Sequence, residues 1–367
     1  MTRRIVLLAA YALLTPSMSV RADEGPLLTS YFDEAEMVSV SDQCVSCDLA
    51  SHKKHGDRDP FFYAGTEMTF MQLSSSSGGR ITASFSDTTP PGQATVSFLD
   101  GNGVDQFAYA PRVWLGIQLG EKWGVVTRFW NLETSDDHFP NYAPGTTPTG
   151  TNFATFEAKD RARLYTYDVE AVRSGELGKW KIDGTAGGRY ASIGVESELY
   201  SFGVFTTGNF VNLMLQNGFS FDGAGITGSL TGRRQIGDSP FSIFLSARGS
   251  YLGGHTDSFG RSAGTVASSP SAPLVGAATV SRNNAESEMD IVEFQAGTQW
   301  DFALRRIPAN AFFRAAVEYQ MWDIDGPPTG GAGFGGTIGE LTTNSFSSAG
   351  IGGANMVGLA LGCGFTW

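Results

Sequence analysis

The sequence predicts an all-β fold: a transmembrane antiparallel up-and-down β-barrel of about ten strands. Three patterns lead to this prediction. Large apolar side chains alternate with small or polar ones in successive runs, short connections alternate with long ones, and aromatic residues lie beside the short connections. In a barrel that crosses a membrane, outer side chains face lipid, inner side chains face the lumen, and one rim has short turns while the other has long loops.

Residues 1–22 are typical of a secretory signal peptide. Two arginines precede an apolar run over 5–14, and a cleavage site with small residues ends at Ala22. The apolar run is shorter than the roughly 20 residues that a membrane-spanning helix needs. We therefore expect the chain to be exported and its signal to be cleaved.

The segment 23–60 is expected to be a flexible periplasmic stretch, because it is acidic, poor in apolar side chains and without a clear period. Cys44 and Cys47 lie in it with His52 and His55 nearby, a set that can in principle hold zinc. In an oxidising compartment a local disulfide or a free pair is the more ordinary outcome. We therefore predict no metal site.

The alternating runs define ten strands from residue 61 onward, and an even count returns the chain to the periplasmic rim. Two further runs, Arg80–Phe85 and Ala94–Phe98, also alternate and leave a twelve-stranded barrel as the alternative. The ten predicted strands lie near 61–73, 107–119, 122–132, 161–173, 179–195, 217–231, 239–252, 288–302, 310–322 and 354–367.

The connections between these strands are of two kinds. Long connections rich in Gly, Pro, Ser and Thr are predicted to be extracellular loops, at about 74–106, 133–160, 196–216, 253–287 and 323–353. Short connections are predicted to be periplasmic turns, at 120–122, 174–179, 232–239 and 303–310.

Charged side chains keep to one face of each predicted strand. In 288–302, for example, Val292 and Phe294 share one face, while Glu293 and Gln295 share the other. The charged face is expected to line the lumen. It carries Arg112, Arg128, Lys181, Arg189, Arg248 and Arg314 together with Asp168, Glu170, Asp183, Glu293 and Glu318.

Aromatic side chains beside the short turns predict a girdle at the periplasmic membrane interface, where an amphipathic ring is stable between hydrocarbon and headgroups. The predicted girdle comprises Trp123, Trp180, Phe241, Trp300 and Trp367. The final stretch VGLALGCGFTW alternates strictly and stops at an aromatic residue. Outer-membrane barrels typically end in this way, so Phe365 and Trp367 are predicted to be a signal for the barrel-assembly machinery.

Several hairpin patterns resemble the Legionella-type major outer membrane protein family, in the version found in planctomycete bacteria. They are PRVWLGIQLGEKWGVVTRFW at 111–130, YTYDVEA at 165–171, WKIDGTAGGRYASI at 180–193, FDGAGITGSLTGRR at 221–234 and SIFLSARGSYLGG at 242–254. The resemblance covers most of the chain from residue 61 onward. It implies a pore-forming barrel in the bacterial outer membrane, without naming a solute.

The predicted lumen leaves two functions open. Barrels of about eight strands are filled by their own side chains, and those of about sixteen leave an aqueous channel, so ten to twelve strands lie between these limits. Opposite charges in a confined interior tend to pair. The chain is therefore expected to be either a porin or narrow channel for ions or small polar solutes, or a structural or adhesive surface barrel plugged by salt bridges.

Other functional classes are not favoured. The 25 basic and 37 acidic side chains give a net charge of −12, and loss of the signal's three arginines leaves 22 against 37, or −15. Such a chain repels nucleic acid. No catalytic constellation accompanies the four histidines, so we expect no enzymatic activity and no cofactor. The expected partners are outer-membrane lipid, the barrel-assembly machinery and, for a channel, its solutes.

Overall fold

The computed structural model describes residues 61–75, 80–87, 94–100, 105–120, 122–138, 151–205, 210–267, 275–304, 309–325, 331–338, 341–348 and 353–367. The predicted signal peptide and the segment 23–60, with Cys44 and Cys47, lie outside these residues. Within the described part of the chain, no helix is long and apolar enough to cross a membrane.

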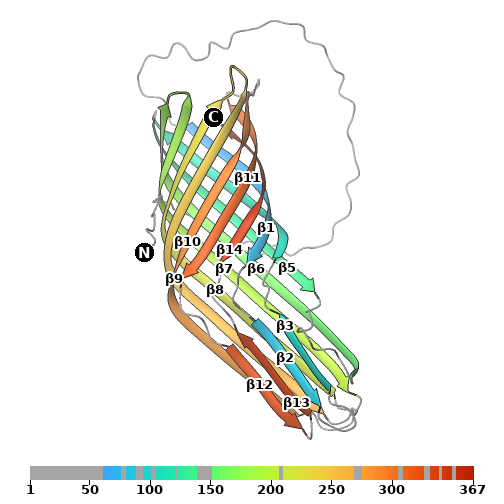
Figure 1. Cartoon of the computed structure of the whole chain (residues 1–367). Coiled ribbons are helices and arrows are strands. Elements are labelled where there is room, and N and C mark those ends of the chain that lie inside the picture. The colour runs from blue at the N-terminus through green and yellow to red at the C-terminus, as the bar shows by residue number, and fades with distance from the viewer. Residues whose placement is uncertain are drawn as a thin grey trace, which may run out of the picture. The chain divides into compact units, whose positions relative to one another are not determined.

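Ten antiparallel strands close into a barrel in which each strand pairs with its neighbours in chain order (Figure 1). The predicted up-and-down barrel of ten strands is thus confirmed. The barrel strands are β1 Phe61–Ser75, β4 Asp105–Leu119, β5 Trp123–His138, β6 Thr151–Leu177, β7 Trp180–Phe205, β8 Phe210–Gln235, β9 Phe241–Ala267, β10 Val275–Ala303, β11 Asn310–Asp325 and β14 Ala354–Thr366.

One rim of the barrel, which we call the turn end, carries the short connections. Gly120, Gly178 and Gly237 have φ values of 70°, 60° and 59° there, a left-handed conformation that glycine adopts without steric cost. The first and last strands also meet at this rim. Phe62 and Trp367 exchange two backbone hydrogen bonds of 3.0 Å, which continue the ladder between β1 and β14.

The other four strands form a separate sheet in the order β12-β13-β2-β3, and do not enter the barrel wall. They are β2 Arg80–Asp87, β3 Ala94–Asp100, β12 Gly331–Ile338 and β13 Leu341–Ser348. The alternating runs near 80–85 and 94–98 are therefore strands, as the alternative required. The twelve-stranded barrel built from them is wrong, because both pair within this second sheet.

Most of the predicted long loops are also strand. The pairing of β5 with β6 ends at His138 and Ala158, and that of β10 with β11 ends at Glu288 and Asp325. Beyond these points β6 to β10 pair with one another as a five-stranded continuation of the wall, which we call the extension. The second sheet lies against β8, β9 and β10 there.

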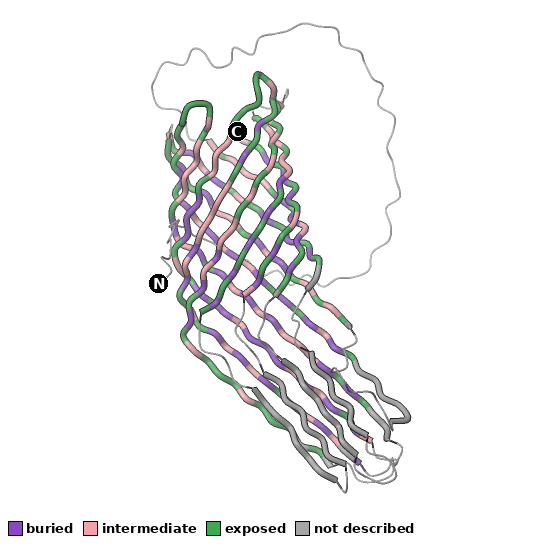
Figure 2. Tube along the Cα trace, viewed as in Figure 1, coloured by how far each residue is buried: buried purple, intermediate pink, exposed green. Residues whose placement is uncertain are grey.

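The sequence does not predict the extension, because its residues are mostly small and polar and such composition is typical of loops. Its inner face is nevertheless buried, at Leu199, Leu213 and Leu215 for example. Alternate burial along β7 and β8 continues past the barrel (Figure 2). Backbone pairing and a covered apolar face therefore keep these segments extended where composition alone favours loops.

Glycines on the inner wall make room for large rings from neighbouring strands. A Cβ at Gly65 would lie 2.3 Å from the ring of Trp114, and one at Gly116 would lie 2.2 Å from the ring of Tyr63. Pairs of this kind explain why small residues face inward although the barrel interior is crowded. The small inner face of β14 follows the same rule, since Gly364 lies under the ring of Phe312.

Candidate functional site in the barrel lumen

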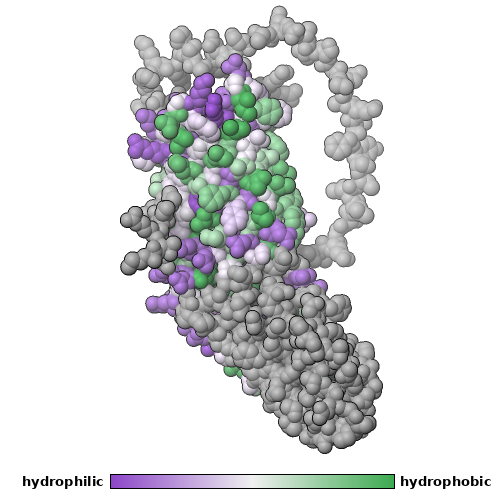
Figure 3. Space-filling view, viewed as in Figure 1, coloured by the Kyte–Doolittle hydropathy of each residue, from purple (hydrophilic) through white to green (hydrophobic). Residues whose placement is uncertain are grey.

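The outer wall of the barrel is apolar. On β14, Val357, Leu359 and Leu361 are exposed, while Ala354, Met356 and Ala360 on the opposite face are buried. Apolar residues also gather over the visible barrel wall in Figure 3. A contiguous apolar band around a closed strand ladder is the surface that a bilayer covers, because lipid offers no partners for polar groups.

The predicted girdle residues all lie on this outer face near the turn end. Phe241 and Trp300 stack with their ring centroids 5.6 Å apart, and Trp367 contacts Phe62 at 6.1 Å. The guanidinium of Arg173 lies 5.2 Å from the ring centroid of Trp123. Trp180 is partly buried on the same face, and Phe365 is exposed one step inside Trp367. Rings and a cation at one level are typical of a membrane interface.

A first ion cluster joins β1, β4 and β11 inside the lumen. Arg112 contacts Glu67 at 2.7 Å and Glu318 at 2.5 Å, and Arg314 contacts the same oxygen of Glu67 at 2.9 Å. The amide of Gln295 on β10 donates a 2.7 Å hydrogen bond to Glu318. Because β4 and β11 are not neighbours in the wall, the pair of Arg112 and Glu318 crosses the lumen.

A second ion cluster joins β5, β6, β7, β9 and β10. Arg189 binds Asp168 at 2.9 Å and also pairs with Glu293. Arg248 contacts Asp168 at 3.1 Å and Glu170 at 3.0 Å. Arg128 completes the cluster with a 3.0 Å contact to Glu170. The contacts from β9 to β6 and from β7 to β10 again cross the lumen.

The two ion clusters are each balanced in formal charge. The first pairs Arg112 and Arg314 with Glu67 and Glu318, two against two. The second sets three arginines against three carboxylates: Arg128, Arg189 and Arg248 against Asp168, Glu170 and Glu293. Balance matters because an unpaired charge in a confined interior costs several kcal/mol, and loss of one partner of a buried pair costs about 3 to 5 kcal/mol.

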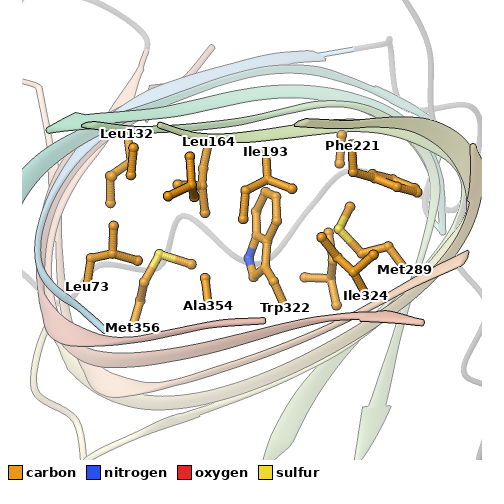
Figure 4. Packing of buried hydrophobic residues seen from close by; sticks show 14 of the residues in the cluster. Leu73, Leu132, Leu164, Ile193, Phe221, Met289, Trp322, Ile324, Ala354 and Met356 are labelled. Atoms are coloured by element: carbon orange, nitrogen blue, oxygen red, sulfur yellow. The ribbon is translucent and has the colours of Figure 1, made fainter. Parts of the chain in front are cut away.

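An apolar layer fills the lumen between the ion clusters and the extension. Its side chains come from all the strands of the barrel. Those labelled in Figure 4 point toward one another. The rings of Trp130 on β5 and Trp322 on β11 meet across the lumen with centroids 5.8 Å apart. The layer comprises Met71, Leu73, Trp130, Leu132, Leu164, Ile193, Val195, Phe219, Phe221, Leu252, Met289, Ile291, Trp322, Ile324, Ala354 and Met356, with four further alanines between them.

A cavity of about 150 Å³ lies on the turn side of the apolar layer. Charged side chains of both ion clusters line it, together with Tyr63, Trp114 and Trp130. One water molecule needs about 10 to 15 Å³ of such space, so the cavity is large enough for several. The lumen therefore holds, in order from the turn end, a cavity lined by ion-cluster side chains and aromatic rings, and then the apolar layer.

Nine of the eleven predicted lumen residues belong to the two ion clusters. The other two do not. Lys181 shares the inward parity, but its side chain is exposed at the turn end. Asp183 accepts a 2.6 Å hydrogen bond from Ser174 near the same rim. Both lie within the first few residues of β7, at the solvent-exposed rim of the barrel.

Sequence reasoning missed Glu67 and the apolar layer. Glu67 is the single charge on the inward face of the first strand, beside Tyr63 and Gly65, and the same test of alternation identifies it. The apolar layer leaves a different signal. At Phe129-Trp130 and Leu164-Tyr165 both faces of a strand are apolar, which indicates that the inner face is buried as well as the outer one.

Among the residues that the structure describes, no group of three or more His, Cys, Asp or Glu side chains is placed to hold an ion. Every described member of the ion clusters instead meets an opposite charge.

The closed strand ladder, apolar outer wall and charged interior define a transmembrane β-barrel. No protein-family model matches the sequence, and no curated protein matches it. Among solved structures, the outer membrane protease OmpT of Escherichia coli is similar, with 11% identity and a TM-score of 0.34 over 83% of this chain and 96% of that one.

Two further solved structures are also similar to this chain. The toluene transporter TodX of Pseudomonas putida shows 7% identity and a TM-score of 0.27 over 85% of this chain and 90% of that one. A FadL homologue of Pseudomonas aeruginosa shows 9% identity and a TM-score of 0.25 over 84% and 90%.

Proposed function

We propose that this protein is an outer-membrane barrel whose filled lumen is closed to solutes, and that its working surface is the extension outside the membrane. The observation that carries the proposal is the apolar layer, in which Trp130 and Trp322 touch across the lumen. A channel needs a continuous path of water, and rings of charge tune selectivity only where water passes. Balanced ion pairs beneath an apolar seal serve instead as internal packing.

The proposed orientation follows from the girdle and the two rims. Short turns and the aromatic band favour the periplasmic side for the turn end, which directs the extension to the outside of the cell. In this reading the barrel anchors and displays the extension and its sheet. Lipid covers the apolar wall, and the assembly machinery recognises the strand that ends in Phe365 and Trp367. We assign no catalysed reaction to the chain.

A narrow channel is the second candidate. The cavity on the turn side of the apolar layer favours it, because charged side chains of both ion clusters line the lumen there. Membership of the Legionella-type pore-forming family, which the hairpin patterns suggest, also favours it. In this case the apolar layer acts as a gate that opens by rearrangement of Trp130 and Trp322.

Planar-bilayer conductance of the refolded full-length protein separates the two candidates. We expect the wild type to insert and remain silent, and the double variant Trp130→Ala/Trp322→Ala to conduct, because removal of both rings opens the seal. Trp300→Ala is the matched control, since its ring lies on the lipid face. Reproducible stepwise openings of the wild type would overturn the closed barrel in favour of the channel.

A further inference from the structure

The walls of the luminal cavity present more positive than negative charge. Its lining includes five arginines and two carboxylate residues, Asp168 and Glu293. The arginines are Arg112, Arg128, Arg189, Arg248 and Arg314. The three glutamates that balance the ion clusters, Glu67, Glu170 and Glu318, are absent from the lining.

The depth of the charged groups explains this difference. The side chains of Glu67, Glu170 and Glu318 are 0% exposed, whereas those of Arg128 and Arg314 keep 24% and 20% of their surface. The glutamates therefore lie behind the guanidinium groups as seen from the cavity. A guest in the cavity is closer to the cations than to the anions that neutralise them, and Coulomb attraction grows as the distance falls.

The lining arginines differ in how far a guest can reach them. The Arg314 side chain keeps 20% of its surface, and its ion pair with Glu67 engages one terminal nitrogen. The Arg189 side chain is only 1% exposed, and Asp168 and Glu293 engage both of its terminal nitrogens. Arg314 can therefore donate to a guest, whereas Arg189 contributes its charge from behind the wall.

Arg314 is held in place by aromatic rings. Its guanidinium lies 4.5 Å from the ring centroid of Trp114 and 5.7 Å from that of Phe244. These contacts fix the plane of the group independently of its ion pair with Glu67. A planar guanidinium with a fixed orientation is preorganised for the oxygens of an oxyanion.

We propose that the luminal cavity binds one small inorganic oxyanion, of the class of phosphate or sulfate, between the arginines of the two ion clusters. The site uses the accessible side chains of Arg128 and Arg314, which keep 24% and 20% of their surface. Oxyanions suit it better than a spherical halide, because guanidinium donors match paired oxygens. Asp168 and Glu293 also line the cavity, and Arg189, which binds both of them, offsets part of their charge.

Isothermal titration of the folded full-length protein in detergent micelles with sodium phosphate, at constant ionic strength, tests the site. We expect saturable binding of one phosphate per barrel. Arg314→Gln should weaken it about tenfold or more, because one charge-assisted hydrogen bond is lost. The matched control is Arg233→Gln, which removes the same charge near the turn end, where Arg233 pairs with Asp301 at 3.3 Å and does not line the cavity.

Absence of saturable phosphate and sulfate binding to a correctly folded barrel would overturn the proposal, and so would equal weakening by Arg233→Gln. If Arg314→Gln does not fold, Arg128→Gln makes the same comparison from the second ion cluster. The result is independent of the conductance experiment. A barrel that shows no conductance can bind the anion or fail to bind it, and the same holds for a barrel that conducts.

Discussion

Two neighbouring levels of the lumen fill the same space by opposite means. Along β6, Asp168 and Glu170 belong to the second ion cluster, and Leu164, four residues before Asp168, belongs to the apolar layer. The ion clusters depend on directed pairs in which each charge compensates another, whereas the apolar layer depends on contact area and close packing. The two levels should therefore respond differently to single and to paired substitutions.

We expect the largest loss of stability when one charged side chain is removed from an ion cluster. Arg112→Gln removes the common partner of Glu67 and Glu318 and leaves buried carboxylates undercompensated. We expect the free energy of unfolding to fall by about 3 to 5 kcal/mol. Urea titration in detergent micelles, followed by tryptophan fluorescence, measures it.

The matched control for Arg112→Gln is Arg163→Gln on the outside of the protein. Arg163 contacts Glu133 at 3.3 Å, and both side chains are largely exposed. Exposed pairs contribute about 0 to 1 kcal/mol, so this variant should unfold close to the wild type. Equal losses for the two arginines would show that the luminal pairs are not desolvated.

The second largest loss of stability is expected when a side chain of the apolar layer is shortened. Leu164 is fully buried, and Leu164→Ala creates a cavity that costs about 2 to 5 kcal/mol. Leu359→Ala removes the same atoms from the lipid-facing wall, where the acyl chains of the bilayer fill the gap. If both variants lost the same stability in lipid vesicles, the layer would not be packed as described.

Replacement of both members of an ion pair should lower the free energy of unfolding least. It also distinguishes the ion clusters from the apolar layer most clearly. Arg112→Met with Glu318→Leu removes one charge of each sign and leaves Arg314 paired with Glu67 at 2.9 Å. Because a buried pair is often replaceable by apolar groups without loss, we expect stability within about 1 kcal/mol of the wild type. A loss as large as that of Arg112→Gln alone would mean that the ion pairs provide net attraction beyond charge compensation.

The barrel itself was predictable because its signal repeats in every strand. Alternation placed Val292 and Phe294 outward and Glu293 inward, and the same rule placed nine of the eleven predicted lumen charges in the ion clusters. Turn residues were equally informative, since Gly120, Gly178 and Gly237 lie at three predicted short turns.

The extension and the full extent of the apolar layer were not predictable, for two physical reasons. Glycine, serine and threonine in 253–287 are typical of loops, and only pairing with neighbouring strands keeps them extended. Two apolar faces, as at Leu164-Tyr165, indicate that the inner face of one strand is buried, but they do not show which residues it meets across the lumen. Which strands approach one another across the lumen is a property of the closed barrel and of no single segment.

The seam between β1 and β14 has a kinetic consequence. Tyr63 pairs with Thr366, so the two strands that complete the wall are separated by almost the whole described chain. Contacts between residues so far apart in the sequence form slowly, because the chain loses loop-closure entropy before the contacts contribute favourable free energy. Every partly assembled form therefore exposes two unpaired strand edges, which are prone to pair with other chains. We therefore expect the yield of the folded barrel to depend on protection of those edges until β1 and β14 pair.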